Sequence, residues 1–468
     1  MSATQHPGTE KDPTAPPAPT VARNAVDEIP PRGRMIFLSL QHLLTFYATV
    51  LVLPIIIAAG IGLSKPDTVV LLGAVVLVSG IGTIIQSVGV WKIGIRQPLV
   101  LGGSAVVIGP TIAIANANGA GSTGLLAVFG ASIVAGAVVF ALSPLYGKLL
   151  RLLPPVVTGC VIAMVGFSLL PITVNLMGGG NPTAPDFASP ANLTIAGTTL
   201  LVILVLFRFG RGLLKSLAIF IGLIAGTVTG AAVGVVDFSG IADANWFDVV
   251  RPFHFGLPTF EIGAIISMTV AILIVGVECT SSYFAMGEIV GRKPLGKDVQ
   301  RGIAAEGLSA MIAGIFSAVP PTTFNGNVGL VRASGVKSRW VVALTGVLML
   351  IVSCLPKIAA VVSILPTPAV GAALLTLFGI IATVGIQTLA KVELTNDKNL
   401  IIIAISLGVG FIPSSSATFF HTAPESIQMV LQSGIVLTAI VAILLNLAFN
   451  GFTSKADVEH EMEETPPA

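Results

Sequence analysis

Glu278 is the residue in this sequence whose type and position most clearly indicate a chemical role. It lies in the run "ILIVGVECTSSYFAMGEIVGR", behind a long series of apolar and small residues that places it near the middle of a membrane. A charged carboxylate is costly at that depth, so such residues are usually shielded and functional. Ser281 and Ser282 follow at spacings that put them on the same helical face. The pattern predicts either a polar patch with a titratable centre or a carboxylate that only hydrogen-bonds a neighbouring helix.

Glu306 and His42 are further ionisable side chains within apolar segments. Glu306 shares a helical face with Ser309 and Ala310, small residues that permit close helix packing. We expect it either to orient a site from behind or to pair with a base near the cytoplasmic end. His42 is expected either to be a hydrogen-bonded packing residue or to carry a proton.

Sequence motifs of the common enzyme sites are missing. There is no P-loop, zinc motif, Ser/His/Asp set or dinucleotide fingerprint. Cys160, Cys279 and Cys354 lie in apolar runs without ligand-like spacing, so we expect free, buried thiols. We therefore expect no enzyme, no metal site and no organic cofactor. A carboxylate-bearing core without an ATPase motif favours ion-coupled secondary transport.

Membrane segments must position these groups. Hydrophobic residues make up 54% of the chain and charged residues 10%, against about 25% charged in soluble proteins. A membrane span needs about 20 apolar residues. The candidate segments are 35–62, 69–91, 122–144, 147–175, 193–208, 213–237, 260–288, 302–319, 339–356, 366–388, 398–412 and 429–450. We expect a disordered tail at 1–34, without a signal peptide, and an acidic tail at 453–468.

Two Gly-rich stretches break this pattern at membrane depth. They are "RQPLVLGGSAVVIGP" (96–110) and "TTFNGNVGLVRASG" (322–335), and each takes the third place in a set of seven segments. Broken elements at matching places predict a transporter of two inverted repeats with the substrate between them. The repeats would span 35–237 and 260–452, joined by an extracellular loop at 238–259. The other interpretation is two ordinary Gly-containing loops.

The positions of Lys and Arg predict the orientation. With the N-terminus in the cytoplasm, the basic residues fall in cytoplasmic loops except for Lys65, Arg251 and Lys357. The alternation predicts an even number of spans and two cytoplasmic termini.

Four blocks carry a resemblance to a known family. They are "LQHLLTFYATVLVLP" (40–54), "QPLVLGGSAVVIGP" (97–110), the stretch 277–339 that ends in "GVKSR", and the Pro-initiated segment at 366. Together they resemble the nucleobase–cation symporter-2 family, also called nucleobase–ascorbate transporters, over about 35–450. The resemblance implies an all-α polytopic membrane protein of fourteen segments in a 7+7 inverted repeat. It also implies two short crossed β-strands in segments 3 and 10.

The resemblance further implies a core domain, segments 1–4 and 8–11, that slides against a gate domain, segments 5–7 and 12–14. Family members are typically dimers and mostly proton-coupled. Glu278 matches the glutamate that accepts hydrogen bonds from ring N–H groups of a base, and Glu306, His42 and Ser282 are the implied second layer and proton-coupling groups. The residues expected around the base are Gly103, Ser104, Ala105, Gly326, Asn327, Val328 and Gly329.

Two positions depart from the family pattern. Gly326 stands where a Gln or Glu usually reads the base, and Ala105 where a Phe often stacks on it. Asn325 could substitute, but at a neighbouring strand position its side chain would face the other way.

The form of the signature resembles urate and xanthine members more than uracil members. The resemblance thus implies a proton-coupled uptake transporter for a purine-type base, urate or xanthine first, in the plasma or inner membrane, without a nucleic-acid partner. The alternatives are a uracil or other nucleobase symporter, an anion transporter of the same fold, a receptor that binds a base without moving it, and sodium as the coupling ion.

Overall fold

Helices dominate the protein, and the one sheet in the described residues has two strands. The computed structural model describes residues 25–50, 52–146, 152–211, 213–236, 238, 241, 245–416 and 418–451. Its first half contains α1 (Arg32–Val50), α2 (Val52–Ile61), α3 (Lys65–Val88), β1 (Leu101–Gly103), α4 (Ile108–Ala117), α5 (Gly121–Leu142), α7 (Pro155–Met177), α8 (Pro190–Phe209), α9 (Leu213–Ser216) and α10 (Ala218–Ala232). Its second half contains α12 (Ile262–Val290), α13 (Gly296–Ile315), β2 (Pro321–Thr323), α14 (Asn325–Ser334), α15 (Arg339–Ser353), α16 (Pro356–Ser363), α17 (Thr367–Leu389), α18 (Asp397–Ser415), α19 (Glu425–Leu431) and α20 (Gly434–Phe449).

Every predicted segment coincides with a helix, two consecutive helices, or a strand followed by a helix. Within the described residues, seven helices are long and apolar enough to cross a membrane: α3, α5, α7, α8, α12, α17 and α18. The bent pair α15–α16, with an angle of 89° between its helices, would make an eighth. Helices α4, α10 and α20 are apolar but shorter. The protein is therefore a polytopic helical membrane protein, and the count of fourteen spans stays a prediction.

Serine side chains define where several helices begin. The hydroxyls of Ser64, Ser189, Ser338 and Ser433 each accept a hydrogen bond from a backbone N–H in the first turn of α3, α8, α15 and α20. Such caps satisfy donors that have no partner within the helix and contribute about 1 kcal/mol each.

The two Gly-rich stretches meet in an antiparallel pair. Leu101 pairs with Thr323, Gly102 with Thr322 and Gly103 with Pro321. The N–H of Phe324 donates to Val100 O at 2.9 Å and extends the ladder. All six strand residues are buried, so the backbone groups that break the helices find their partners in each other.

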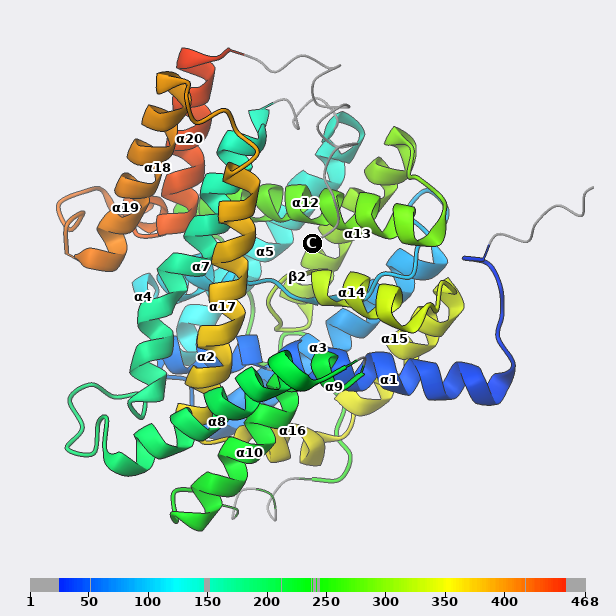
Figure 1. Cartoon of the computed structure of the whole chain (residues 1–468). Coiled ribbons are helices and arrows are strands. Elements are labelled where there is room, and N and C mark those ends of the chain that lie inside the picture. The colour runs from blue at the N-terminus through cyan, green and yellow to red at the C-terminus, as the bar shows by residue number, and fades with distance from the viewer. Residues whose placement is uncertain are drawn as a thin grey trace, which may run out of the picture.

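The helices pack in two groups, each drawn from both halves of the sequence (Figure 1). The core group contains α1–α5 and α12–α16, and the gate group contains α7–α10, α17, α18 and α20, while α19 packs against α12 and α4 of the core group as well as against α20. The most extensive pairings are α7 with α17, α5 with α13, and α3 with α15, all within a group. The two groups coincide with the core and gate segments that the resemblance implied.

Small residues allow these pairs to approach closely. An added Cβ at Gly385 of α17 would collide with the backbone of Ala163 in α7. In the core group, a Cβ at Gly307 of α13 would lie 2.6 Å from the backbone N of Phe140 and 2.8 Å from Gly136 O. Each pair can therefore pack only because these positions carry no side chain.

We expect Gly307→Ala to lower the free energy of unfolding by about 1–3 kcal/mol, because backbone on the facing helix cannot yield to the added methyl. Gly197→Ala in α8 is the matched control, since no heavy atom lies within 4 Å of its added Cβ. The measurement is the midpoint of thermal unfolding in detergent. Equal midpoints for the two variants would contradict the close approach of α5 and α13.

Arg339, the last residue of the family signature, binds the segment just before α1 to the core group. Its Nε lies 2.6 Å from Asp27 Oδ1, and its Nη1 donates to Val88 O at 2.8 Å. Ser338 donates to Glu28 O at 2.6 Å. Residues 25–31 are thus held in place, and α1 begins at Arg32, inside the stretch assigned to the N-terminal tail. Residues 1–24 and the C-terminal tail lie outside the described residues.

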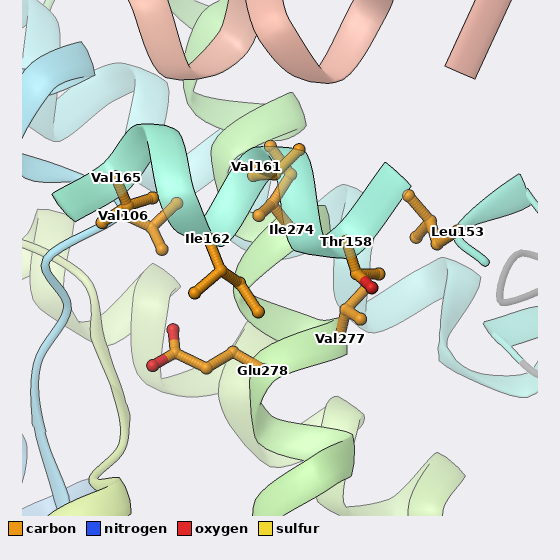
Figure 2. Close-up of a pocket in the computed structure, with 9 residues that line it drawn as sticks. All are labelled: Val106, Leu153, Thr158, Val161, Ile162, Val165, Ile274, Val277 and Glu278. Carbon is orange, nitrogen blue, oxygen red and sulfur yellow. The ribbon is translucent and has the colours of Figure 1, made fainter. Parts of the chain in front are cut away.

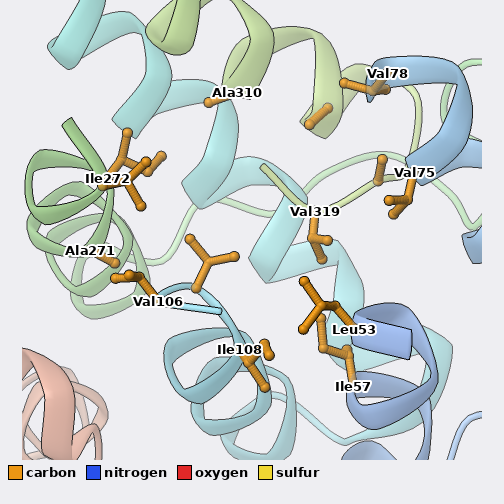
Figure 3. Close-up of a cluster of buried hydrophobic side chains, with 14 of the residues drawn as sticks. Leu53, Ile57, Val75, Val78, Val106, Ile108, Ala271, Ile272, Ala310 and Val319 are labelled. Carbon is orange, nitrogen blue, oxygen red and sulfur yellow. The ribbon is translucent and has the colours of Figure 1, made fainter. Parts of the chain in front are cut away.

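Apolar side chains from distant segments fill the space around the strand pair. Figure 3 shows Leu53, Val75, Val106, Ile272 and Val319 converging from both halves of the sequence.

The prediction for the cysteines is confirmed for Cys160 and Cys279, which are free and buried. Cys354 is also free, but its predicted burial is wrong, since it is only partly buried at the bend between α15 and α16.

Candidate functional site

Glu278 lies in α12 at the boundary between the core and gate groups. Its side chain lines a small cavity and extends toward the face of α7 that carries Ile162 (Figure 2). Val277 and Ile274 of α12 and Val106, just after β1, complete the core-group side of this cavity. The one carboxylate among the lining residues is therefore surrounded mainly by aliphatic side chains.

Helix α7 forms the opposite wall of the cavity. Thr158, Val161, Ile162 and Val165 line it, and the spacing of residues 158, 162 and 165 puts them on one helical face. No sequence motif had marked α7, because apolar residues in an apolar helix carry no signal of a site.

The cavity is small. Its volume is about 20 Å³, which is room for about one water molecule. A bicyclic base cannot enter this space unless the α7 wall and the α12 wall separate. In this structure the α7 wall and the α12 wall therefore lie too close together to hold such a ligand.

Glu306 lies at the centre of a buried polar network behind the strands. Its Oε1 accepts hydrogen bonds from Gln86 Nε2 at 3.1 Å, Tyr283 OH at 3.0 Å and Thr323 Oγ1 at 2.6 Å. Gln86 Nε2 also donates to Tyr283 OH at 2.7 Å, and Gln86 Oε1 accepts from Ile95 N. The Glu306 carboxylate thus joins α3, α12, α13 and β2. Of the two roles expected for Glu306, this arrangement favours support of the site from behind.

His42 and Asn327 connect α1 to both Gly-rich stretches. His42 Nδ1 lies 2.8 Å from Asn327 Oδ1, and Asn327 Nδ2 donates to Pro98 O at 2.6 Å. Because Asn327 Nδ2 donates to Pro98 O, Asn327 Oδ1 is the atom that faces the His42 ring, and it can only accept. His42 Nδ1 therefore carries the proton, and Nε2 of a neutral ring is then an acceptor. That Nε2 is buried and has no hydrogen-bond partner among the described residues.

Gly103, Ser104 and Ala105, which were expected around the base, precede the lining residue Val106 but do not line the cavity themselves. A Cβ at Gly103 would lie 2.9 Å from Leu53 Cδ1, so its missing side chain serves packing against α2. Ser104 is buried and its hydroxyl accepts from Val106 N at 3.3 Å, while Ala105 is partly buried against the apolar core.

The second stretch departs from its predicted form. The backbone is helical from Asn325, so the strand alternation predicted for Asn325 is wrong, and Gly326, Asn327, Val328 and Gly329 lie in α14. The strand ends earlier because only Pro321–Thr323 has a partner in β1. Val328 packs in the core, whereas Gly329 is exposed, and a Cβ added there would meet no heavy atom within 4 Å.

The serines after Glu278 separate onto different surfaces. Ser282 is buried and donates to Glu278 O at 3.2 Å. Ser281 is exposed and donates to Val277 O, so the predicted polar patch does not include it. Cys279 ties this turn of α12 to β2, with Sγ 2.9 Å from Thr322 Oγ1.

Sequence reasoning missed Gln86, Tyr283, Thr323 and the α7 wall. Gln86 gave a usable signal, since it is an uncharged polar residue in the otherwise apolar run 69–91. The described residues contain no group of three His, Cys, Asp or Glu side chains that could hold a metal.

Comparison with known proteins adds a family relationship. A family model described as "Permease family" matches residues 33–419. The uric acid transporter UacT of Escherichia coli (strain K12) is 37% identical over 93% of this chain and 90% of its own length. The xanthine permease of Bacillus subtilis (strain 168) is 35% identical over 92% of this chain and 97% of its own. The uric acid permease PucK of the same organism is 37% identical over 89% and 95%.

Solved structures share the fold at low sequence identity. The transmembrane domain of the cyanobacterial bicarbonate transporter BicA aligns with a TM-score of 0.55 at 14% identity, over 90% of this chain and 98% of that one. SLC26A9 aligns with a TM-score of 0.58 at 13% identity, over 88% of this chain and 65% of that one. These likenesses confirm a transporter fold.

Proposed function

Because this chain belongs to the permease family that its motifs predicted, the nucleobase–cation symporter-2 family, we propose that it carries a purine-type base, urate or xanthine, together with a proton. Members of this family are permeases and not enzymes. The observation that carries the proposal is the position of Glu278, a carboxylate on a cavity between the two helix groups. The relatives that carry uric acid or xanthine favour urate and xanthine over uracil as the substrate.

The base would lie with its edge on Glu278 and its faces against aliphatic side chains. A carboxylate is an acceptor only, so it pairs with ring N–H groups. Val106 and Ile162 would supply apolar surface for the flat ring from opposite walls. Backbone groups at Gly103–Ala105 and Asn327–Gly329 would bind the remaining polar edge.

Movement of the core group against the gate group would expose Glu278 alternately to the two sides of the membrane. The small volume of the cavity supports this mechanism, since a base can enter only when α12 and α7 separate. Most strong contacts fall within the groups rather than between them, which suits motion of each group as one body.

Proton coupling would use Glu278 with His42 and Glu306. His42 Nε2 and Glu306 Oε2 are buried atoms without hydrogen-bond partners among the described residues, so each can take a proton without breaking a bond seen there. One proton that enters with a neutral base down 100 mV releases about 2.3 kcal/mol. That would support roughly 50-fold accumulation, since about 1.4 kcal/mol corresponds to a factor of ten.

We further propose a homodimer in the plasma or inner membrane with both termini in the cytoplasm. The resemblance implies the dimer, and the placement of Lys and Arg supports the orientation. An anion transporter of the same fold fits less well, because sulfate and bicarbonate present no ring N–H groups to Glu278.

The test is uptake of labelled urate, xanthine, guanine and uracil into proteoliposomes with an inward proton gradient. We expect urate or xanthine to accumulate, and a protonophore to abolish the accumulation while leaving exchange of bound base intact. A thermal-shift screen of the same bases should raise the unfolding midpoint for the transported ones. Accumulation of uracil alone, or flux of sulfate or bicarbonate without base binding, would overturn the purine assignment.

A further inference from the structure

Thr158 is the polar side chain that the gate group contributes to the cavity of Glu278. It lies on the same face of α7 as Ile162, above Val277 of α12 (Figure 2). Apart from Thr158 and Glu278, all lining side chains are aliphatic. Each wall therefore offers one polar side chain to the cavity: Glu278 on α12 is a carboxylate that accepts hydrogen bonds, and Thr158 on α7 is a hydroxyl that can also donate.

The hydroxyl of Thr158 is weakly engaged within its own helix. Its contacts to Pro154 O and Pro155 O are both 3.4 Å, well beyond the usual 2.7–2.8 Å for O–H···O bonds. Several other helix threonines donate to the preceding turn at shorter distances: 2.7 Å at Thr173, 2.8 Å at Thr199 and 2.6 Å at Thr269, although Thr376 does so at 3.3 Å. Thr158 can therefore give its proton to a ligand with little loss.

We propose that Thr158 donates a hydrogen bond to a carbonyl oxygen of the bound base and so selects oxidised purines. This inference rests on the proposed function. A ring N–H beside a carbonyl, as in xanthine and urate, presents a donor and an acceptor side by side. Glu278 accepts from the donor, and Thr158 donates to the acceptor from the opposite wall.

The contact also couples recognition to closure. Glu278 belongs to the core group and Thr158 to the gate group, so one base can touch both only after the walls come together. A site that hydrogen-bonds a substrate oxygen discriminates against analogues without it, because its own polar group is then left unpaired. Adenine, which has no ring carbonyl, lacks this partner.

The test compares inhibition constants of urate, xanthine and adenine for uptake by the wild type, Thr158→Val and Thr158→Ser. Loss of one hydrogen bond predicts constants about tenfold higher for urate and xanthine in Thr158→Val. The constant for adenine should stay unchanged, and Thr158→Ser should restore the wild-type values. Thr173→Val in the same helix, away from the cavity, is the matched control and should alter no constant selectively.

Equal shifts for all three bases, or no shift for any, would overturn the role of Thr158. Thermal unfolding of each variant in detergent separates misfolding from a changed site, and Thr158→Ser provides a second reading if the valine variant is unstable. Failure of the proposed function looks different, because wild-type protein would then bind and carry no purine. If purines are carried and Glu278→Gln is inactive while Thr158→Val discriminates as before, only the role of Thr158 fails.

Discussion

Glu278→Gln is expected to lower uptake of urate or xanthine about 100-fold. The carboxylate accepts a hydrogen bond from the base, and hydrogen bonds to charged groups contribute about 1.5–3 kcal/mol. An amide of the same size keeps one acceptor oxygen but loses the negative charge and the second acceptor, because its NH₂ group can only donate. It also cannot carry a proton across the membrane. Initial rates of uptake by proteoliposomes under a fixed proton gradient measure the effect.

Glu288→Gln is the control for this change. It makes the same substitution in α12, but at an exposed position nearly three turns further along. It should transport at the wild-type rate. Glu278→Asp keeps the charge but draws it back by one methylene, so an intermediate rate is expected. Undiminished uptake by Glu278→Gln would remove Glu278 from the site.

Glu306→Leu is expected to destabilise the core group by several kcal/mol. The substitution leaves Gln86, Tyr283 and Thr323 without their shared acceptor, and each unsatisfied buried group costs about 1–3 kcal/mol. The loss should show as a low yield of folded protein and a lower midpoint of thermal unfolding in detergent.

Two milder variants separate support from proton coupling at this position. Glu306→Gln keeps an acceptor oxygen, so it should fold and exchange labelled base for unlabelled base. It cannot release a proton, so accumulation driven by a proton gradient should fail. Tyr283→Phe removes one donor to Glu306 and one acceptor for Gln86, which keeps Glu306 as an acceptor, so it should cost about 1–3 kcal/mol. A Glu306→Leu protein as stable as the wild type would show that the network does not hold β2.

Much of the fold follows from apolar run lengths and from Gly-rich interruptions. The segment places could be predicted because apolar runs and their breaks are local properties of the chain. The resemblance added the division into two groups, which matches the observed packing. Glu278 could be singled out because a carboxylate is so costly in a membrane that its presence needs a reason.

The rest of the site depends on contacts between distant segments. Gln86 and Glu306 are 220 residues apart, and no periodicity links them. The α7 wall is invisible in the sequence, because Ile162 and Val165 look like any lipid-facing or core residue. Asn325 was misplaced because the extent of β2 depends on how many residues of β1 it can pair with.

The pairing of β1 with β2 sets an order of events during synthesis. Asn327 and Pro98, which flank the strands, are 229 residues apart. At about 5–20 residues per second, the ribosome needs roughly 10–45 s to make the partner that completes the first strand. Until then the backbone of Leu101–Gly103 is an unpaired edge, although α7–α10 have already emerged. The nascent chain must therefore keep that edge against water, the translocon or other protein rather than lipid, which offers no hydrogen-bond partners. The gate helices of the first half are thus made before the core group can be completed.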